Sequence, residues 1–371
     1  MPQYFQDYMK KILCLIDGFG SGGAERQMVG LAILLKRKGY YVDLVAYHEE
    51  KSFYVTHARQ GGIEPIYLHS EQTRWSKLIS VRRFIRKQGG YDCIIAYKDG
   101  PNAIGCLLKL LGLRFKLIVS ERNADTVVGG KKNLFKLYRM ANYVVPNSYS
   151  KGEFLAKNFP WMEKKIKTIT NFTDVVYFSP KTTSLSQKKK YRVLTVGRLT
   201  KEKNILNYLD AVLLLKEKGV ANLHFDWYGD VGYGAEDYAK ECNEKMISNG
   251  LIDYFEFHKA TPDILKHYQE CDLFCLPSLY EGFPNVVCEA MSCGKPIICG
   301  DICDNSRIVS EGNNGLLFDP NNVEDMADKL LQMINMSQEQ RDQWGKKSRE
   351  IAVDLLSEES FVNKYISLIE Q

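Results

Sequence analysis

Two carboxylates, Glu281 and Glu289, stand eight residues apart and offer the clearest chemistry in the sequence. They flank a Gly/Pro turn that opens into a short helical run, Val286–Met291. The N terminus of a helix presents unpaired backbone N–H groups and the positive end of the helix dipole, so it is a natural seat for phosphate. Carboxylates beside such a seat accept hydrogen bonds from hydroxyl groups, such as those of ribose and of sugar rings. The combination predicts a site for a nucleotide-sugar.

Two basic residues, Arg198 and Lys203, are placed to supply the opposing positive charge. The segment Val196–Leu199 ends an expected strand, and Lys203 follows on the next turn. Arginine offers a planar fork to phosphate oxygens and lysine a mobile point charge, so together they would neutralise a diphosphate leaving group. The alternative is the ordinary basic start of a surface helix.

A pair of glycines, Gly22 and Gly23, lies where the first expected strand turns into the first expected helix. Paired glycines let the backbone approach a ligand closely, and the helix start after them can hold an anion. A tight turn without any ligand would have the same sequence. The pattern is not G-x-G-x-x-G, although Asp43 lies near the spacing expected of a ribose-binding acid, and a nicotinamide enzyme is therefore disfavoured.

Several motifs that would indicate other chemistry are missing from the sequence. There is no D-x-D, the short acidic motif that holds a divalent metal against a diphosphate, and no G-x-S-x-G or P-loop. None of the six histidines pairs with another at ligand spacing, so we expect no metal site. The ten cysteines form no C-x-x-C pair, which disfavours a zinc cage or a disulfide framework and favours a reducing cytosol.

Short β-branched runs alternate with longer helical patterns along the chain. The expected strands are Lys11–Ile16, Tyr41–Ala46, Asp92–Tyr97, Lys116–Ser120, Tyr143–Pro146, Arg192–Val196, His224–Tyr228, Asp272–Leu276 and Pro296–Cys299. The expected helices between them include Ala24–Lys38, whose apolar face recurs at helical spacing and which stops at Gly39. This alternation predicts an α/β fold with parallel sheets that are covered by helices on both faces.

The polar segment Lys181–Lys190 interrupts this rhythm, and a new first strand begins at Tyr191. We therefore expect two doubly wound, Rossmann-like domains in tandem, residues 1–175 and 190–356, with an interdomain cleft. The helical pattern Ser360–Ile369 is expected to bring a C-terminal helix, about 357–371, back onto the first domain.

The composition is that of an ordinary globular protein, with 45% hydrophobic and 26% charged residues. No apolar run approaches the length of a membrane span. The charge is unevenly distributed: residues 1–175 have 28 Lys/Arg against 15 Asp/Glu, whereas the remainder has 22 against 30. The excess of +13 in the first half indicates either solvated helix faces or a surface for an anionic partner, such as a bilayer, a lipid phosphate or a nucleic acid.

Four segments together resemble glycosyltransferase family 4. They are Gly22–Arg26 (GGAER), Val196–Leu199 (VGRL) with Lys203 and Asn204 after it, Asn171–Asp174 (NFTD), and Ser278–Ile298 (SLYEGFPNVVCEAMSCGKPII). The resemblance extends over nearly the whole chain and is most specific in the last segment. It implies a retaining enzyme of the GT-B fold that acts on a nucleotide-sugar, with the acceptor on the first domain and the donor on the second.

The resemblance also implies roles for individual residues. Arg198 and Lys203 would bind the donor diphosphate, Glu281 would contact the transferred sugar, and Glu289 would bind the ribose hydroxyls. Of these, Arg198, Lys203 and Glu281 are the expected catalytic residues. The remaining donor contacts are expected from the glycine turn and from the backbone of the turn before the helix: Gly22, Gly23, Gly282, Phe283, Asn285 and Val286.

The segment Glu121-Arg122-Asn123 departs from many members of the family, which have a histidine near this position. A similar Glu-Arg pair occurs in members that extend lipid-linked oligosaccharides. We therefore expect these three residues on the acceptor side, where Arg122 would hold an acceptor phosphate or the donor and Glu121 a hydroxyl. A salt bridge between the domains is the alternative.

The sequence therefore predicts a metal-independent transferase without a cofactor, which moves a hexose or an N-acetylhexosamine to a glycan. The acceptor is expected to be linked to polyprenyl diphosphate, and the donor to be a UDP-sugar, with a GDP-sugar possible. We expect a cytoplasmic protein on the inner face of the plasma membrane, held at an anionic surface and binding no specific nucleic acid. The product would be a surface polysaccharide or glycan, such as lipopolysaccharide or capsule.

Two other functions remain open from the sequence. A nucleotide-sugar epimerase of the same fold would need no acceptor. A noncatalytic nucleotide or nucleic-acid binder would use the basic half, although the sequence contains no recognised nucleic-acid motif.

Overall fold

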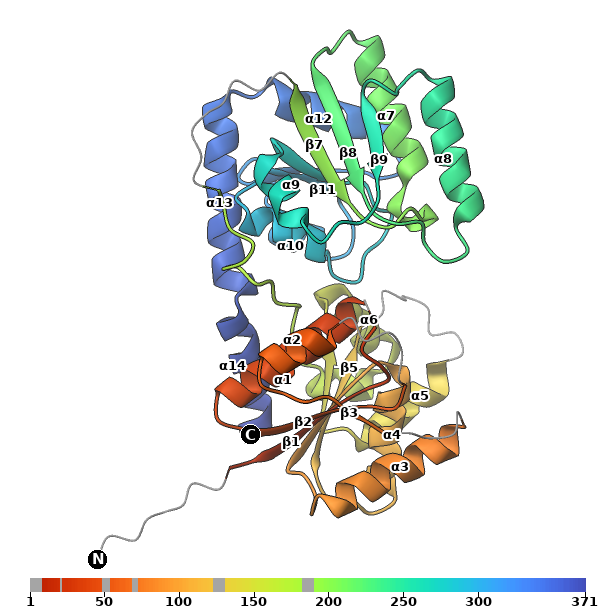
Figure 1. The fold of residues 1–371 in the computed structure, drawn as a ribbon, viewed down its shortest axis with the longest axis vertical. Coiled ribbons are helices and arrows are strands. Elements are labelled where there is room, and N and C mark those ends of the chain that lie inside the picture. The colour runs from red at the N-terminus through yellow and green to blue at the C-terminus, as the bar shows by residue number, and fades with distance from the viewer. Residues whose placement is uncertain (1–8, 21, 49–53, 69–72, 123–130, 182–189) are drawn as a thin grey trace, which may run out of the picture. The chain divides into compact units, whose positions relative to one another are not determined.

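The computed structural model describes residues 9–20, 22–48, 54–68, 73–122, 131–181 and 190–371. It divides into two compact units, which are coloured in sequence order in Figure 1. Unit 1 comprises Met1–Asn171 together with Glu359–Gln371, and unit 2 comprises Phe172–Glu358. Asn123 and most of the polar segment 181–190 lie outside the described residues.

Unit 1 is built on a six-stranded parallel sheet in the order β3-β2-β1-β4-β5-β6. Its strands are β1 Lys11–Ile16, β2 Tyr41–Ala46, β3 Ile66–Tyr67, β4 Cys93–Tyr97, β5 Lys116–Glu121 and β6 Tyr143–Pro146. Its helices are α1 Gly23–Arg37, α2 Val55–Gln60, α3 Arg74–Lys87, α4 Asp99–Leu110, α5 Lys132–Leu137, α6 Tyr149–Asn158 and α14 Glu358–Glu370. Short 3₁₀ turns, η2 Tyr138–Met140 and η3 Pro160–Lys165, complete it. Strands β1, β4 and β5, in the middle of the sheet, are buried almost throughout, as expected for a parallel sheet with both faces covered.

Helix α14 is tied to unit 1 by buried polar contacts as well as by its apolar face. The hydroxyl groups of Tyr97 and Tyr365 lie 2.8 Å apart, and Arg122 donates to the Tyr365 hydroxyl at 2.7 Å. The ammonium group of Lys116 donates to the carbonyl oxygens of Leu368 and Ile369 near the end of the helix. The last helix of the chain therefore completes the first unit.

Unit 2 has its own six-stranded parallel sheet, in the order β12-β11-β10-β7-β8-β9. Its strands are β7 Tyr191–Val196, β8 Leu223–Tyr228, β9 Phe255–His258, β10 Leu273–Leu276, β11 Ile297–Gly300 and β12 Gly315–Phe318. Its helices are α7 Ile205–Glu217, α8 Glu236–Ser248, α9 Ile264–Glu270, α10 Asn285–Ser292, α11 Asn305–Ile308, α12 Val323–Asn335 and α13 Gln338–Leu356, with the 3₁₀ turn η4 Lys201–Lys203. Counted from its own first strand, unit 2 has the same strand order as unit 1.

Two separate hydrophobic clusters cover the two faces of the unit 2 sheet. One packs residues of α7, α8 and α12 against Val193, Phe225 and Trp227. The other packs residues of α9, α10 and α13 against Leu194 and Phe274. The alternation along β7 and β8 sends neighbouring side chains into different clusters, as the period of a strand requires.

The expected doubly wound α/β fold is confirmed, and all nine expected strands are present within one residue at each end. Three strands were not expected. Strand β3 has only two residues, β9 includes a glutamate and a histidine, and β12 begins at a glycine directly after the Gly-Asn-Asn turn of residues 312–314. Among the described residues, no helix is long and apolar enough to cross a membrane.

Candidate functional site in unit 2

The strand order of unit 2 reverses its direction between β7 and β10, and we call this place its switch point. In open parallel sheets, ligands bind beside the carboxyl ends of the strands at a switch point. Strand β7 is followed by Gly197 and Arg198, and β10 by Pro277 and Ser278. The sequence segments with the strongest expectations therefore meet where the topology favours a ligand.

The turn after β7 is fixed by a very close backbone approach. A Cβ atom on Gly229 would lie 2.0 Å from the carbonyl oxygen of Gly197, so only glycine fits at position 229. The indole N–H of Trp227 donates to the same carbonyl oxygen at 2.7 Å. Because Gly229 and Trp227 both restrain this carbonyl group, the backbone that leads into Arg198 is fixed in position.

Arg198 itself is exposed, and within the described residues its guanidinium group forms no ion pair or side-chain hydrogen bond. A guanidinium group remains protonated at any physiological pH and presents its donors in a planar fork. The Arg198 side chain is therefore available to an anion that arrives at the switch point.

Lys203 and Glu281, 78 residues apart in the sequence, form an ion pair in which both side chains are largely buried. The hydroxyl of Ser278 donates to Oε1 of Glu281 at 2.7 Å. The next residue after Lys203, Asn204, adopts a left-handed conformation with φ of 60° and donates to the carbonyl oxygens of Pro277 and Pro320. These contacts fix the end of η4 against the end of β10 and so hold Lys203 beside Glu281.

Helix α10 begins directly after the turn that contains Glu281 and Gly282. Phe283 is buried in the core and anchors the turn, and Pro284 is the N-cap residue. In the described structure no side chain caps this helix, so its positive end is not neutralised by a capping acceptor. Asn285 and Val286, in the first turn of α10, are partly exposed. A phosphate group could therefore reach the N-terminal end of α10.

Glu289 lies one turn further along α10 and is almost completely buried. Its Oε2 atom accepts a hydrogen bond of 2.9 Å from the hydroxyl of Tyr268 in α9. The structure thus gives the second carboxylate a fixed orientation through a residue that the sequence did not single out.

Unit 1 has an equivalent switch point, between β1 and β4, and here the glycine turn lies at the start of α1. A Cβ atom on Gly22 would lie 2.3 Å from an oxygen of Glu25, so this carboxylate folds back over the start of its own helix. Lys98 forms ion pairs with Glu25 and, at 3.0 Å, with Asp17. The Glu25 carboxylate of unit 1 thus occupies the space beside Gly22.

Lys98 is held in an unusual conformation, with φ of 75°. Non-glycine residues in this region are strained by about 1 to 3 kcal/mol and need support from their surroundings. Burial alone would lower the pKa of the Lys98 ammonium group, but its bonds to Glu25 and Asp17 outweigh burial and raise that pKa. The charge cluster therefore stabilises the strained residue.

Glu121, at the end of β5, is buried and accepts a hydrogen bond from the hydroxyl of Tyr138. Its other oxygen, Oε2, has no hydrogen-bond partner among the described residues. Burial raises the pKa of the Glu121 carboxyl, and the Tyr138 hydrogen bond opposes that rise. The unpartnered oxygen could accept a hydrogen bond from a hydroxyl group.

Arg122 follows Glu121 and packs its guanidinium carbon 4.0 Å from the centre of the Tyr97 ring. It donates to Asn171 and Tyr365, both at 2.7 Å. Within the described residues of unit 1 it has no carboxylate partner. Arg122 thus links the β-sheet to α14 through Tyr365. Its other acceptor, Asn171, is the first residue of the NFTD segment.

Comparison with known proteins decides the family. Residues 21–177 match the family described as "Glycosyltransferase Family 4", and residues 181–351 match "Glycosyl transferases group 1". An uncharacterized glycosyltransferase of Methanocaldococcus jannaschii is 34% identical over 268 residues, which are 71% of each chain. The chain is a group 1, family 4 glycosyltransferase.

Other relatives of this glycosyltransferase have more specific names. A Campylobacter jejuni protein named as an alpha-1,4-N-acetyl-D-galactosaminyltransferase acting on a diphospho-undecaprenol-linked saccharide is 26% identical over 339 residues, covering 88% of this chain and 89% of that protein. A second Campylobacter jejuni N-acetylgalactosaminyltransferase of this kind is also 26% identical, over 346 residues, covering 88% of this chain and 90% of that protein.

Solved structures share the fold of this glycosyltransferase. A glycosyltransferase from Rickettsia africae superimposes with a TM-score of 0.86 at 18% identity, covering 98% of each chain. HepE from Anabaena, solved in complex with UDP, superimposes with a TM-score of 0.84 at 19% identity, covering 98% of this chain and all of that one. Together with the two parallel sheets, these neighbours confirm the GT-B fold.

Sequence reasoning missed several residues that orient the expected ones. Ser278 could have been found, because it lies three residues before Glu281 and just after a predicted strand. Lys98 also follows a predicted strand directly. The tyrosines that hold Glu121 and Glu289, Tyr138 and Tyr268, lie within helical segments and have no sequence pattern that marks them.

Proposed function

We propose that this glycosyltransferase moves a hexose or an N-acetylhexosamine from a nucleotide-sugar to a lipid-linked glycan, with retention of anomeric configuration and without a metal ion. The proposal rests on the Lys203–Glu281 ion pair, the exposed guanidinium group of Arg198 and the N-terminal end of α10. Together they offer cations and N–H groups to a diphosphate, and a carboxylate to a sugar hydroxyl.

The Lys203–Glu281 pair suits a ligand that has both an anion and hydroxyl groups. On binding, the mobile ammonium group would turn from Glu281 to the diphosphate, and the freed carboxylate would accept hydrogen bonds from the sugar. Ser278 would keep the carboxylate in place during this exchange, because it donates to Glu281 independently of Lys203. Glu281 would thus position the sugar rather than attack it.

The proposed transfer needs no protein nucleophile. The bond from the anomeric carbon to the phosphate oxygen breaks, and a bond from the same carbon to the acceptor oxygen forms on the same face. The acceptor proton passes to an oxygen of the leaving phosphate. Arg198, Lys203 and the N–H groups at the start of α10 would stabilise the charge that develops on the diphosphate.

The substrates are proposed from the relatives. The Campylobacter jejuni relatives are named for N-acetylgalactosamine transfer to diphospho-undecaprenol-linked saccharides, which favours an acceptor linked to polyprenyl diphosphate. Anabaena HepE has been solved with UDP and with UDP-glucose, which favours a UDP-sugar over a GDP-sugar as donor. On the acceptor side, we propose that Oε2 of Glu121, which has no partner among the described residues, binds an acceptor hydroxyl.

Helix α3 of unit 1 suits the proposed docking on an anionic bilayer at the inner face of the plasma membrane. Its 14 residues include six Lys/Arg and no acidic residue. Trp75 is 72% exposed and Ile79 46% exposed, and an exposed tryptophan on a basic helix is suited to the headgroup region. Vesicles of anionic phospholipid should sediment the protein, less so at high salt or with Trp75→Ala. Sedimentation that does not depend on salt would contradict this electrostatic docking.

The function itself is tested by incubating the purified protein with UDP- or GDP-sugars and with diphospho-undecaprenol-linked acceptors. We expect release of nucleoside diphosphate only when both substrates are present, and a product whose anomeric configuration matches that of the donor. Release of the diphosphate without acceptor, or isomerised sugar, would instead support the epimerase. Full activity of Glu281→Gln would contradict the role given to this carboxylate.

A further inference from the structure

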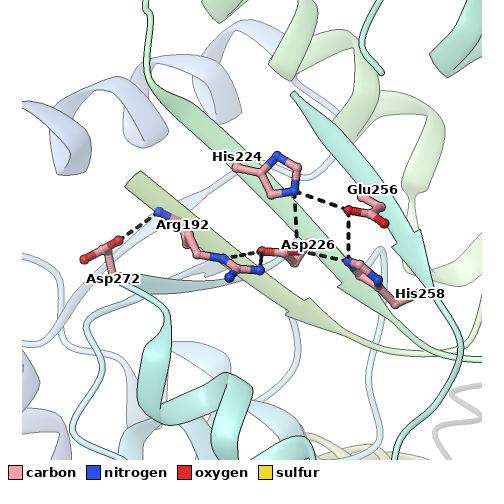
Figure 2. A network of polar contacts seen from close by, with 6 residues as sticks. All are labelled: Arg192, His224, Asp226, Glu256, His258 and Asp272. Carbon is pink, nitrogen blue, oxygen red and sulfur yellow. Dashed lines mark hydrogen bonds and ion pairs between the residues drawn. The ribbon is translucent and has the colours of Figure 1, made fainter. Parts of the chain in front are cut away.

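A second cluster of ionisable side chains lies in unit 2 on the edge strand β9 and its neighbour β8 (Figure 2). Strand β8 contributes His224 and Asp226, and strand β9 contributes Glu256 and His258. On each strand the two residues are separated by one position, so they point to the same face of the sheet. Because Asp226 is paired in register with Glu256, the two pairs of side chains meet across the strands.

The four potential ligand atoms alternate between nitrogen and oxygen. Nε2 of His224 lies 3.5 Å from Oδ1 of Asp226 and 3.7 Å from Oε2 of Glu256. Nε2 of His258 lies 3.0 Å from the same aspartate oxygen and 3.7 Å from the same glutamate oxygen. Each imidazole therefore faces both carboxylates through the nitrogen that is available to a metal.

The distances from Nε2 of His224 to the two carboxylate oxygens, 3.5 and 3.7 Å, are close to the spacing of ligands around zinc, whereas His258 is hydrogen-bonded to Asp226 at 3.0 Å. With metal–ligand bonds of about 2.0 to 2.2 Å, the corners of a tetrahedron lie about 3.3 to 3.6 Å apart. The ligand atoms of His224, Asp226 and Glu256 also all lie within 4.8 Å of one another. A metal ion could therefore bind between them after only small movements of the side chains.

Asp226 is oriented by a partner on its far side. The guanidinium group of Arg192 donates to Oδ2 from Nε at 2.9 Å and from Nη2 at 2.7 Å, and this leaves Oδ1 to the imidazoles. The backbone N–H of Arg192 in turn donates to Asp272 at 2.8 Å. Such outer contacts fix the ligating atom of a carboxylate in metal sites.

We propose that His224, Asp226 and Glu256 bind a Zn²⁺ ion, beside His258, which is hydrogen-bonded to Asp226. Imidazole and carboxylate groups in a four-coordinate arrangement are the donors that zinc accepts. Asp226 is buried, whereas the Glu256 side chain is 58% exposed, so the ion reaches the site from the Glu256 side. The metal joins β9 to β8 and thereby stabilises the open edge of the sheet, separately from the proposed sugar transfer.

The test is zinc binding by the full chain after chelator treatment and dialysis, measured by calorimetry with zinc sulfate and by the unfolding temperature. We expect one zinc ion per chain and an unfolding temperature that rises with zinc, because a ligand of the folded state stabilises it by mass action. Magnesium chloride should leave the unfolding temperature unchanged, because Mg²⁺ prefers oxygen ligands and retains its waters.

The variants His224→Gln and Glu256→Gln should each weaken zinc binding by about tenfold or more, since even outer-sphere partners affect metal affinity by about 10–100-fold. Glu256→Gln is a mild change at a solvent-facing side chain, and circular dichroism confirms that each variant is folded. The matched control His57→Gln alters an exposed histidine of α2, and Cys303→Ser alters the one cysteine of the ten that is not buried. Both controls should bind zinc as the unaltered chain does.

Three results would overturn the site. The first is zinc binding by the unaltered chain that does not exceed that by Glu256→Gln. The second is zinc binding by both ligand variants that is as tight as that by His57→Gln. Stabilisation by Mg²⁺ equal to that by zinc would show a general acidic patch in place of a zinc site.

Discussion

The switch points of units 1 and 2 have the same backbone topology but different side chains. In unit 1, Lys98 is bound by two carboxylates, Asp17 and Glu25, and one of these lies over the start of α1. In unit 2, Lys203 faces the single carboxylate of Glu281, and the described residues place no capping side chain at the start of α10. The first arrangement satisfies its own charges, whereas the second leaves cationic groups for a ligand.

The exposed guanidinium group of Arg198 adds to this difference. Arg198 is the second residue after the first strand of unit 2, and Asp17 is the first residue after the first strand of unit 1. The first strand of unit 1 is therefore followed by an acidic residue, and the first strand of unit 2 by a basic residue. A shared strand order predicts where ligands bind, but the side chains decide which unit receives a diphosphate.

The largest expected effect on activity comes from removing the lysine at the switch point of unit 2, compared with removing the lysine at the switch point of unit 1. Lys203→Ala should lower kcat/KM by about 10²–10³-fold, the usual range for losing one group that stabilises developing charge. Lys98→Ala should mainly lower stability, because it leaves two carboxylates without their partner. Steady-state kinetics with saturating acceptor measure kcat/KM for both variants. If Lys98→Ala reduces kcat/KM as much as Lys203→Ala does, the contrast between the units is wrong.

The two glycines next to the switch points should differ in their tolerance of a side chain. Gly229→Ala forces a methyl group against the backbone carbonyl of Gly197, so we expect a loss of about 3 kcal/mol in unfolding free energy. Gly22→Ala meets only the movable carboxylate of Glu25 and should cost about 1 kcal/mol or less. Urea unfolding of both variants measures this difference. Equal losses would show that the backbone of unit 2 is not the more rigid of the two.

Arg198 allows a test of charge against geometry. Arg198→Lys keeps the positive charge and loses the planar fork, so we expect activity about tenfold lower, between the unaltered enzyme and Arg198→Ala. Because the side chain has no partner among the described residues, neither variant should change the unfolding temperature. A Michaelis constant for the donor that stays constant in both variants would argue against a diphosphate contact.

The smallest effect is the pH dependence that Glu121 gives to unit 1. Its carboxyl has a raised pKa in the folded state, so its contribution to stability is full below the ordinary pKa of 4.5 and is lost as pH rises through the raised value. Relative to Glu121→Gln, the unaltered chain should lose unfolding free energy as the pH rises through this range. Tyr138→Phe removes the hydrogen bond that lowers this pKa and should move the loss to higher pH. Parallel stability curves for the unaltered chain and Glu121→Gln would contradict the raised pKa of this buried carboxyl.

Much of the fold could be predicted because the buried strands are short apolar runs between glycines and charged residues. Strand β9 could not, since its histidine and glutamate belong to a polar face that only the neighbouring strand explains. For the same reason the sequence indicated no metal site. The proposed ligands come from two strands, and no spacing along the chain connects His224 with Glu256.

The candidate donor site was predictable in residue identity and partly in geometry. Arg198, Lys203 and Glu281 all follow predicted strands, and the carboxyl ends of neighbouring parallel strands lie at one edge of the sheet. The partners of these residues were not predictable. Neither the ion pair that joins Lys203 to Glu281 nor the carboxylate over Gly22 can be read from sequence spacing, because both depend on side-chain packing. The donor and acceptor roles of these residues stay predictions.

Helix α14 has a consequence for synthesis of the chain on the ribosome. The buried contacts of Tyr97 and Arg122 with Tyr365 cannot form until translation has passed through unit 2. Domains usually fold in the order in which they emerge, but here the N-terminal sheet must wait for its final helix while unit 2 already has all of its own strands. A nascent chain arrested after α13 should therefore expose the part of the first unit that α14 covers to chaperones and proteases, even though its second unit has folded.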